Sequence, residues 1–404
     1  MNLRGKMKSI SLICGNVIFA FSQFVILSMI TKNYDKISLG YFTLSISLTA
    51  PIFMFFQMNY RTIYATSLRD EISFKKIKTL NLLQSFIALG ISLIITYIFY
   101  KNLSLMIITF NIGISKIVEG IQEISYGYYQ KRKKINSIAL SKGLRGVLAI
   151  LICYLLVYKL KANFIYASLS YFIAWSITLV FFDSHNVKDK EMICKNEKSY
   201  LDIIKQGFPL GVTVFLDSLI VNSPRYYVSI FLGFQEVAYF SSLLYFMNLG
   251  QIVVTSITQT YISELSSSID TNFNKYLELK KKLIVMSLLI GIIIIIFPVL
   301  FSDFILPIVF DKSFIQYKNE FVLIMVAAAI WYLAGIYHTC ILATRRFTKQ
   351  SIIFIITFIV MQLFLLIFVP VFGLIGACIS LVLSYLVRLF ISMYMLRKIE
   401  KEIC

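Results

Sequence analysis

Residues 283–302 read LIVMSLLIGIIIIIFPVLFS, a stretch without a charged side chain that directly follows Lys280, Lys281 and Lys282. A helix rises about 1.5 Å per residue, so a stretch of this length covers the roughly 30 Å hydrocarbon core of a bilayer. In lipid, every backbone N–H and C=O must be paired inside the segment, which a helix achieves by itself. The stretch therefore predicts a transmembrane α-helix with a basic flank.

The same pattern recurs along the whole chain. Hydrophobic residues make up 58% of the 404 residues and charged residues 15%, and the mean hydropathy is +0.80. Soluble domains carry about 25% charged residues, so this apolar excess needs lipid. We predict about twelve spans, near residues 8–30, 38–58, 78–99, 103–125, 135–158, 162–182, 207–232, 237–262, 283–302, 318–343, 350–370 and 373–396.

The basic residues of the loops predict the orientation of these spans. Of the 39 Lys and Arg residues, 27 fall in one alternating set of loops and 7 in the other. Loops rich in Lys and Arg stay in the cytoplasm, so both termini are expected there. The net charge of +19 is explained by this topology, and we expect no nucleic-acid partner.

A polar linker divides the chain into two predicted bundles of six helices. The linker covers residues 183–206, and the bundles cover residues 1–182 and 207–404. Two pairs of short strings repeat at equivalent positions: GYFTL at 40–44 with AYFSS at 238–242, and QKRKKINS at 130–137 with TRRFTKQS at 344–351. The fold class is therefore an all-α polytopic membrane protein with a parallel pseudo-repeat, an organisation found in transporters.

Charged residues inside the spans are the candidate functional residues, because each costs about 3 kcal/mol at a helix centre unless it faces a cavity or a partner. Lys116, Glu119 and Glu123 are spaced i, i+3, i+7 and share one helix face, and Lys142 and Arg145 share a face of the next span. One interpretation is an ion pair that ties these two spans together. The other is a polar stripe that offers cations to an anionic substrate.

The seventh span supplies a second candidate. Arg225 follows Pro224, which removes a backbone hydrogen bond and kinks a helix. A broken helix with an arginine is typical of substrate or hinge elements, although Arg225 could also extend to the outer interface. Asp217, in the same span, joins Glu119 and Glu123 as a candidate for coupling to an ion gradient. Arg388, in the last span, is expected to extend to the cytoplasmic interface.

The sequence contains no pattern for catalysis or metal binding. It has no GxSxG, GxxxxGK[ST] or HExxH motif, and its six cysteines form no CxxC pair. His185 and His338 are too far apart in sequence to suggest a metal cluster. We therefore expect no enzyme activity, no cofactor and no metal site.

Several strings together resemble bacterial polysaccharide repeat-unit flippases, a family of the multidrug/oligosaccharidyl-lipid/polysaccharide exporter (MOP) superfamily. They are GYF at 40–42, APIFMFF at 50–56, YRTIYAT at 60–66, ISYGYYQK at 124–131, IALSKGLRG at 138–146, GFPLG at 207–211, NSPRY at 222–226 and ATRRFTKQ at 343–350. Each string is loose, but they occur in family order over most of the chain. The last two spans are the least similar part.

The resemblance implies two six-helix bundles around a central cavity, in the bacterial cytoplasmic (inner) membrane. It also implies transport, by alternating access, of undecaprenyl-pyrophosphate-linked oligosaccharides for O-antigen, lipopolysaccharide or capsule assembly. The implied partners are this lipid-linked oligosaccharide, the bilayer, a polysaccharide polymerase and a chain-length regulator. Arginine suits a pyrophosphate because its planar fork binds phosphate oxygens in pairs. Arg145 and Arg225 would contact the head group, with Lys142 and Lys116 as further cations.

Two other functions stay open from the sequence. A drug exporter of the same superfamily would carry cationic cargo, but five of the eight charges inside the spans are cations. An integral-membrane polysaccharide polymerase would normally carry a large outer loop, and the longest outer loop expected here covers only about residues 303–317.

Overall fold

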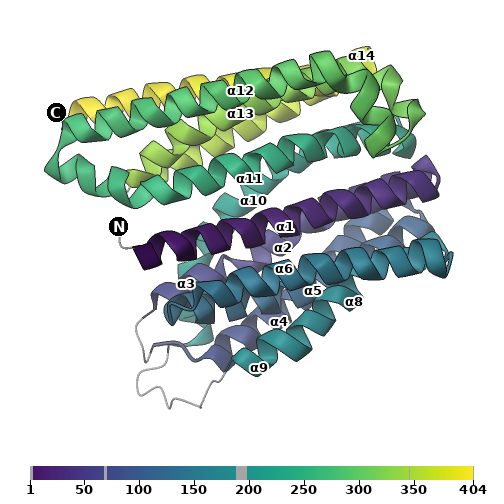
Figure 1. Cartoon of the computed structure of the whole chain (residues 1–404), viewed down its shortest axis with the longest axis horizontal. Helices are drawn as coiled ribbons and strands as arrows, with labels where there is room; N and C mark the ends of the chain where they lie inside the picture. The colour runs from purple at the N-terminus through teal and green to yellow at the C-terminus, as the bar shows by residue number, and fades with distance from the viewer. Residues whose placement is uncertain (1–2, 68–70, 188–197, 345, 404) are drawn as a thin grey trace. The chain divides into compact units, whose positions relative to one another are not determined.

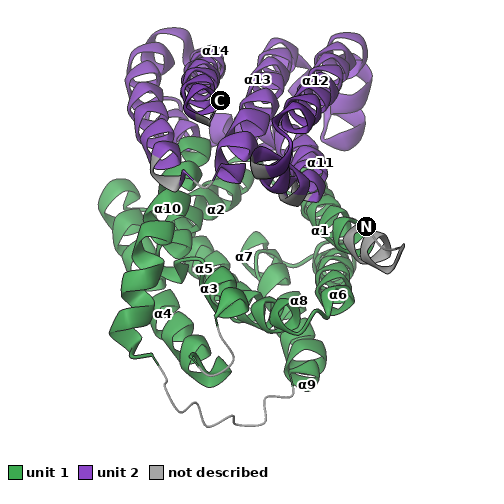
Figure 2. Cartoon of the chain, turned by 90° about the vertical axis from the view of Figure 1, so that its left-hand side faces the viewer, with its two compact units in different colours: residues 1–222 green, residues 223–404 purple. Residues whose placement is uncertain are grey.

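The computed structural model describes residues 3–67, 71–187, 198–344 and 346–403, and these residues form helices and short connections without strands. The chain separates into two compact units, residues 1–222 and 223–404 (Figure 2). Residues 188–197 of the predicted linker lie outside the described residues, so the predicted boundaries at 182 and 207 stay a prediction.

The first unit is a helical bundle. Its elements are α1 (Leu3–Asn33), α2 (Lys36–Gln57), α3 (Tyr60–Thr66), α4 (Phe74–Tyr100), α5 (Leu103–Lys131), α6 (Ile135–Tyr154), the π-helical turn η1 (Leu155–Lys159), α7 (Phe164–Ala167), α8 (Ser170–Thr178), the π-helical turn η2 (Leu179–Asp183), α9 (Ser184–Asn186) and the larger part of α10 (Tyr200–Phe231). The second unit contains the end of α10, α11 (Phe234–Thr271), α12 (Phe273–Val309), the 3-10 turn η3 (Lys312–Tyr317), α13 (Lys318–Ala343) and α14 (Phe347–Ile403).

The predicted spans are confirmed as membrane-length helices. Eleven helical segments of the described residues are long and apolar enough to cross a bilayer. The last of them, Lys349–Glu402, is interrupted at Gly373, whose φ of 61° and ψ of −136° are not helical. A Cβ on Gly376 would come within 2.1 Å of the Phe368 carbonyl oxygen, so the chain folds back on itself at this turn. The segment therefore supplies two crossings.

Short polar side chains set where several helices begin. Asn102 accepts a hydrogen bond from the backbone N–H of Leu105 at 2.9 Å and starts α5, and Asp35 caps α2 in the same way through Ser38. Such caps satisfy backbone donors that the first helical turn leaves unpaired. The loops between spans can therefore be very short.

Helices α1 and α6 pack closely along their length (Figure 1). A Cβ on Gly15 of α1 would lie 2.7 Å from the Ala139 Cα atom of α6, and a Cβ on Gly146 of α6 would lie 3.2 Å from the Phe19 Cα atom of α1. Small residues let membrane helices approach in this way. The close approach places the side chains of α1 directly against those of α6.

Candidate functional site

Arg145 of α6 lies at the centre of a polar network in the first unit. Only 1% of its side chain is exposed. Its guanidinium carbon lies 3.9 Å from the centroid of the Phe19 ring on α1 and 4.8 Å from that of the Trp175 ring on α8. Cations are attracted to aromatic faces at such distances. The two rings therefore hold the guanidinium group from two different helices.

The hydrogen bonds of Arg145 leave part of its guanidinium group unused. Nη1 donates to Gln122 Oε1 at 3.1 Å, and Nη2 lies 3.5 Å from Glu119 Oε1, which is an ion pair longer than a good hydrogen bond. Nε is buried and has no hydrogen-bond partner among the described residues. A guanidinium group carries five N–H donors, so Arg145 keeps donor capacity for another acceptor.

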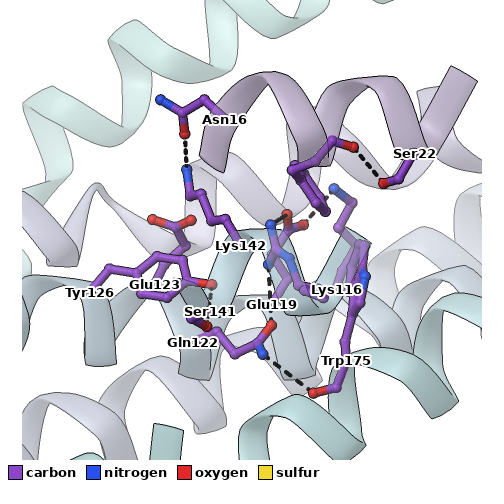
Figure 3. A network of polar contacts seen from close by, with 12 residues as sticks. Asn16, Ser22, Lys116, Glu119, Gln122, Glu123, Tyr126, Ser141, Lys142 and Trp175 are labelled. Carbon is purple, nitrogen blue, oxygen red and sulfur yellow. Dashed lines mark hydrogen bonds and ion pairs between the residues drawn. The ribbon is translucent and has the colours of Figure 1, made fainter. Parts of the chain in front are cut away.

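Glu119 of α5 is shared between two cations. Its Oε2 accepts a hydrogen bond from Lys116 Nζ at 2.7 Å (Figure 3). Its Oε1 forms the longer ion pair with Arg145. Lys116 and Glu119 are 21% and 18% exposed, so this end of the network is less enclosed than Arg145. The ion pair that the charge spacing suggested between the fourth and fifth spans is therefore present.

Glu123, one turn further along α5, has a different partner. Arg61 Nη1 of α3 donates to Glu123 Oε2 at 2.8 Å. The guanidinium carbon of Arg61 also lies 5.7 Å from the centroid of the Tyr126 ring, and Lys142 Nζ lies 5.6 Å from the same centroid. The sequence pattern did not place Arg61 in the site, because it lies in a predicted basic loop after the second span.

Lys142 is the one cation of this network without a carboxylate within 4 Å among the described residues. Its Nζ donates to the side-chain oxygen of Asn16 on α1 at 2.9 Å (Figure 3). An amide oxygen carries only a partial negative charge. The network therefore contains a cation whose charge is not neutralised by a direct ion pair.

Asp183 is a buried carboxylate that the sequence analysis missed. It has no exposed surface. Ser141 Oγ donates to its Oδ2 at 2.9 Å, Gln122 Nε2 donates to the same atom at 3.2 Å, and Tyr129 donates to Oδ1 at 3.2 Å. The sequence predicts Asp183 as the first residue of the linker, but the π-helical turn η2 places it inside the bundle.

The remaining candidates lie elsewhere. Asp217 is half-buried on α10. In the second unit, Arg225 is 5% exposed and its Nε donates to Ser241 Oγ of α11 at 3.0 Å, so its side chain does not extend to an interface. The expectation for Arg388 is wrong: its side chain is 4% exposed, with its guanidinium carbon 4.7 Å from the centroid of the Phe354 ring.

The described residues contain no group of three or more His, Cys, Asp or Glu side chains that is suited to hold a metal ion. The polar network is instead made of cations, two glutamates, one buried aspartate and neutral donors, and it crosses helices α1, α3, α5, α6 and α8. The cations and neutral donors of such a network can bind and position an anion.

These features define a multi-pass α-helical membrane protein with buried charges, and its fold is that of MOP superfamily transporters. An outward-facing multidrug resistance MATE family transporter of the MOP superfamily superposes with a TM-score of 0.68 at 16% identity, covering 98% of this chain and 94% of that one. A MOP superfamily transporter from Pyrococcus furiosus, described as having a binding pocket of reverse polarity, superposes with a TM-score of 0.70 at 14% identity, covering 98% and 95%.

A curated relative has a narrower description. The chain is 23% identical over 390 residues to the capsular polysaccharide biosynthesis protein CapF of Staphylococcus aureus, covering 95% of this chain and 97% of the relative. No family model matches the sequence. The resemblance to polysaccharide flippases of the MOP superfamily, which the sequence strings indicated, is confirmed by these comparisons.

Proposed function

We propose that this protein moves a lipid-linked oligosaccharide with an anionic diphosphate group across the bacterial cytoplasmic membrane by alternating access. The likeness to a capsular polysaccharide biosynthesis protein over 95% of the chain supports a role in making a surface polysaccharide, and favours capsule over O-antigen. The transporter fold supports the mode of action. Its partners in this proposal are the lipid-linked substrate, a polymerase and a chain-length regulator.

The observation that carries the proposal is the positive excess of the network in the first unit. Its cations are Arg61, Lys116, Lys142 and Arg145, and its acidic groups are Glu119, Glu123 and Asp183. Unpaired charge in a membrane interior is costly and normally functional. A diphosphate would neutralise this excess and supply the acceptors that Arg145 lacks.

Each of the charged candidates has a role in the proposal. Arg145 and Lys142 bind the diphosphate, and Lys116 supports the local positive charge. Arg225 lies in the second unit, and its contact with the head group stays a prediction. Coupling to an ion gradient is assigned to the acidic candidates. Among them, Glu119 and Glu123 already form ion pairs, so coupling through either would have to break a pair.

A second candidate function is drug export, which the likeness to multidrug transporters favours. The excess of cations around Arg145 opposes a cationic drug as cargo, because like charges repel in a medium of low dielectric constant. Accumulation of a cationic dye in cells with and without the protein separates the two candidates. Flippase activity predicts equal dye levels, whereas drug export predicts more dye in cells without the protein.

The proposal is tested in cells from which this protein has been removed. We expect the lipid-linked repeat unit to accumulate with its sugar facing the cytoplasm, protected from a membrane-impermeant glycosidase or periodate. Wild-type protein should restore surface polysaccharide, and Arg145→Lys at equal protein level should restore less. Accumulation in the outer leaflet would contradict the proposal, because the block would then lie after transport.

A further inference from the structure

We propose that Glu119 is a resident counter-anion of Arg145, which the diphosphate of the cargo replaces on binding and which returns when the cargo leaves. This inference rests on the proposed function. It assigns to Glu119 the role of weakening the binding of the cargo and speeding its release. It predicts opposite effects on affinity and on turnover from a single substitution.

The contacts of Glu119 are unequal in a way that suits such an exchange. Its distance to Lys116 Nζ is 2.7 Å, whereas its distance to Arg145 Nη2 is 3.5 Å. Lys116 lies three residues earlier on the same helix, so this pair forms locally within α5. Glu119 can therefore release Arg145 and remain paired with Lys116, without leaving a carboxylate alone in the bundle.

The edge of Arg145 that Glu119 covers is the edge an anion would use. Nε and Nη2 point the same way and can donate two parallel hydrogen bonds to one phosphate or carboxylate group. In the structure Nε has no partner among the described residues, and Nη2 has only the long contact to Glu119. Nη1, on the other side, is already bonded to Gln122. This edge of Arg145 is thus buried, and its one charged contact among the described residues is the loosely held carboxylate of Glu119.

Arg145 does not depend on Glu119 for its position. Phe19 and Trp175 hold the plane of its guanidinium group, and Gln122 fixes one nitrogen. Removing Glu119 should therefore leave the fork in place and ready for another anion. An arginine held by its surroundings loses little conformational freedom when it binds, which favours affinity.

A diphosphate cannot simply add to the occupied site. It would bring negative charge next to Glu119 in a region of low dielectric constant, where like charges repel strongly. Exchange keeps the charge of Arg145 balanced before and after binding. Glu119 can also compete with the cargo for Arg145 and so speed the release of the cargo. When the site is empty, Glu119 supplies the counter-ion of the buried arginine.

The test uses the purified full chain in detergent and farnesyl diphosphate, a short polyprenyl diphosphate, as the probe. The sequence has two tryptophans, and Trp175 contacts Arg145, so Trp331→Phe leaves a single reporter at the site. Fluorescence titration gives the affinity and stopped-flow dilution gives the release rate. If Trp331→Phe does not fold, calorimetric titration of the chain with both tryptophans replaces the fluorescence signal.

We expect Glu119→Gln to tighten binding roughly tenfold, the effect of one charge-assisted contact, and to slow release by a similar factor. Glu264→Gln is the matched control, because Glu264 forms an exposed pair with Lys275 and should leave both values unchanged. Arg145→Lys should weaken binding, since lysine lacks the fork.

The outcomes separate the inference from the proposed function. Unchanged or weaker binding by Glu119→Gln, with normal binding by the parent and weak binding by Arg145→Lys, overturns the counter-anion and leaves the flippase proposal standing. A parent protein that binds no farnesyl diphosphate removes both. Tighter binding with slower release, specific to Glu119, supports the exchange.

Discussion

The guanidinium carbon of Arg145 lies 3.9 Å from the centroid of the Phe19 ring, a contact between the fifth and first membrane spans. The sequence around Arg145 does not predict that it contacts Phe19, and the sequence around Phe19 does not predict a contact with Arg145. The contact exists because glycines bring the two helices together, and it holds a buried cation in a fixed orientation.

Phe19→Leu should destabilise the first unit. A buried cation–π contact contributes about 2 kcal/mol, so with the lost packing we expect unfolding to become easier by about 2–3 kcal/mol. Thermal unfolding in detergent measures the change. Phe21→Leu is the control on the same helix, because the Phe21 side chain is 56% exposed and should matter little. Equal shifts for the two variants would show that the Arg145 contact contributes nothing.

Gly146→Ala should separate α1 from α6, whereas Gly143→Ala should not. A Cβ on Gly146 would meet Ser22 Oγ at 2.9 Å and the Phe19 Cα atom at 3.2 Å, but nothing lies within 4 Å of a Cβ on Gly143. We expect a loss of about 1–3 kcal/mol at Gly146 and a gain of up to about 1 kcal/mol at Gly143. Melting temperatures of the two variants, compared with wild type, provide the check. A stabilised Gly146→Ala protein would contradict the packing described here.

The Arg61–Glu123 pair should couple α3 to α5. The two side chains are 25% and 27% exposed, so solvent weakens the pair, and we expect a coupling free energy of about 1 kcal/mol. A double-mutant cycle with Arg61→Gln, Glu123→Gln and both together isolates this value from other effects of each substitution. If the two single substitutions change the free energy of unfolding additively, the 2.8 Å contact contributes no coupling free energy.

The orientation of the spans is also open to measurement. Single cysteines placed in a cysteine-free protein at Lys161 and Lys312 should react with a membrane-impermeant thiol reagent in intact cells. A cysteine at Lys133 should react only after the membrane is permeabilised, because basic loops stay in the cytoplasm. The reverse pattern would invert the topology and place both termini outside.

The sequence predicted the helices of this protein better than its side-chain contacts. Apolar runs of membrane length determine the spans, and the turn at Gly373 falls at the predicted start of the last span, 373–396. An ion pair between the fourth and fifth spans was one of two interpretations of the charges that share helix faces, and Glu119 forms it with Arg145. Such patterns are periodic within one helix, so they can be read without knowing the fold.

Other parts of the site depend on contacts between distant helices and leave no local pattern. Trp175 looks like ordinary apolar bulk in its span, yet it packs against Arg145. Arg61 looks like one of many loop cations, and its partner Glu123 lies 62 positions away. Asp183 lies at the end of an apolar run, and the geometry of the last helical turn determines whether its side chain is buried or exposed to solvent. These residues could be assigned only from the structure.

The most direct test of the central claim is transport by the purified protein in vesicles of neutral lipid. A fluorescent polyprenyl diphosphate-linked sugar is placed in both leaflets, and a membrane-impermeant quencher reports how much reaches the outer leaflet over time. We predict that wild-type protein exposes nearly all of the label, and that Arg145→Lys slows this exposure at least tenfold with the protein folded. Equal rates for wild type and Arg145→Lys, or no exchange above empty vesicles by wild type, would contradict the claim that these buried cations carry an anionic cargo across the membrane.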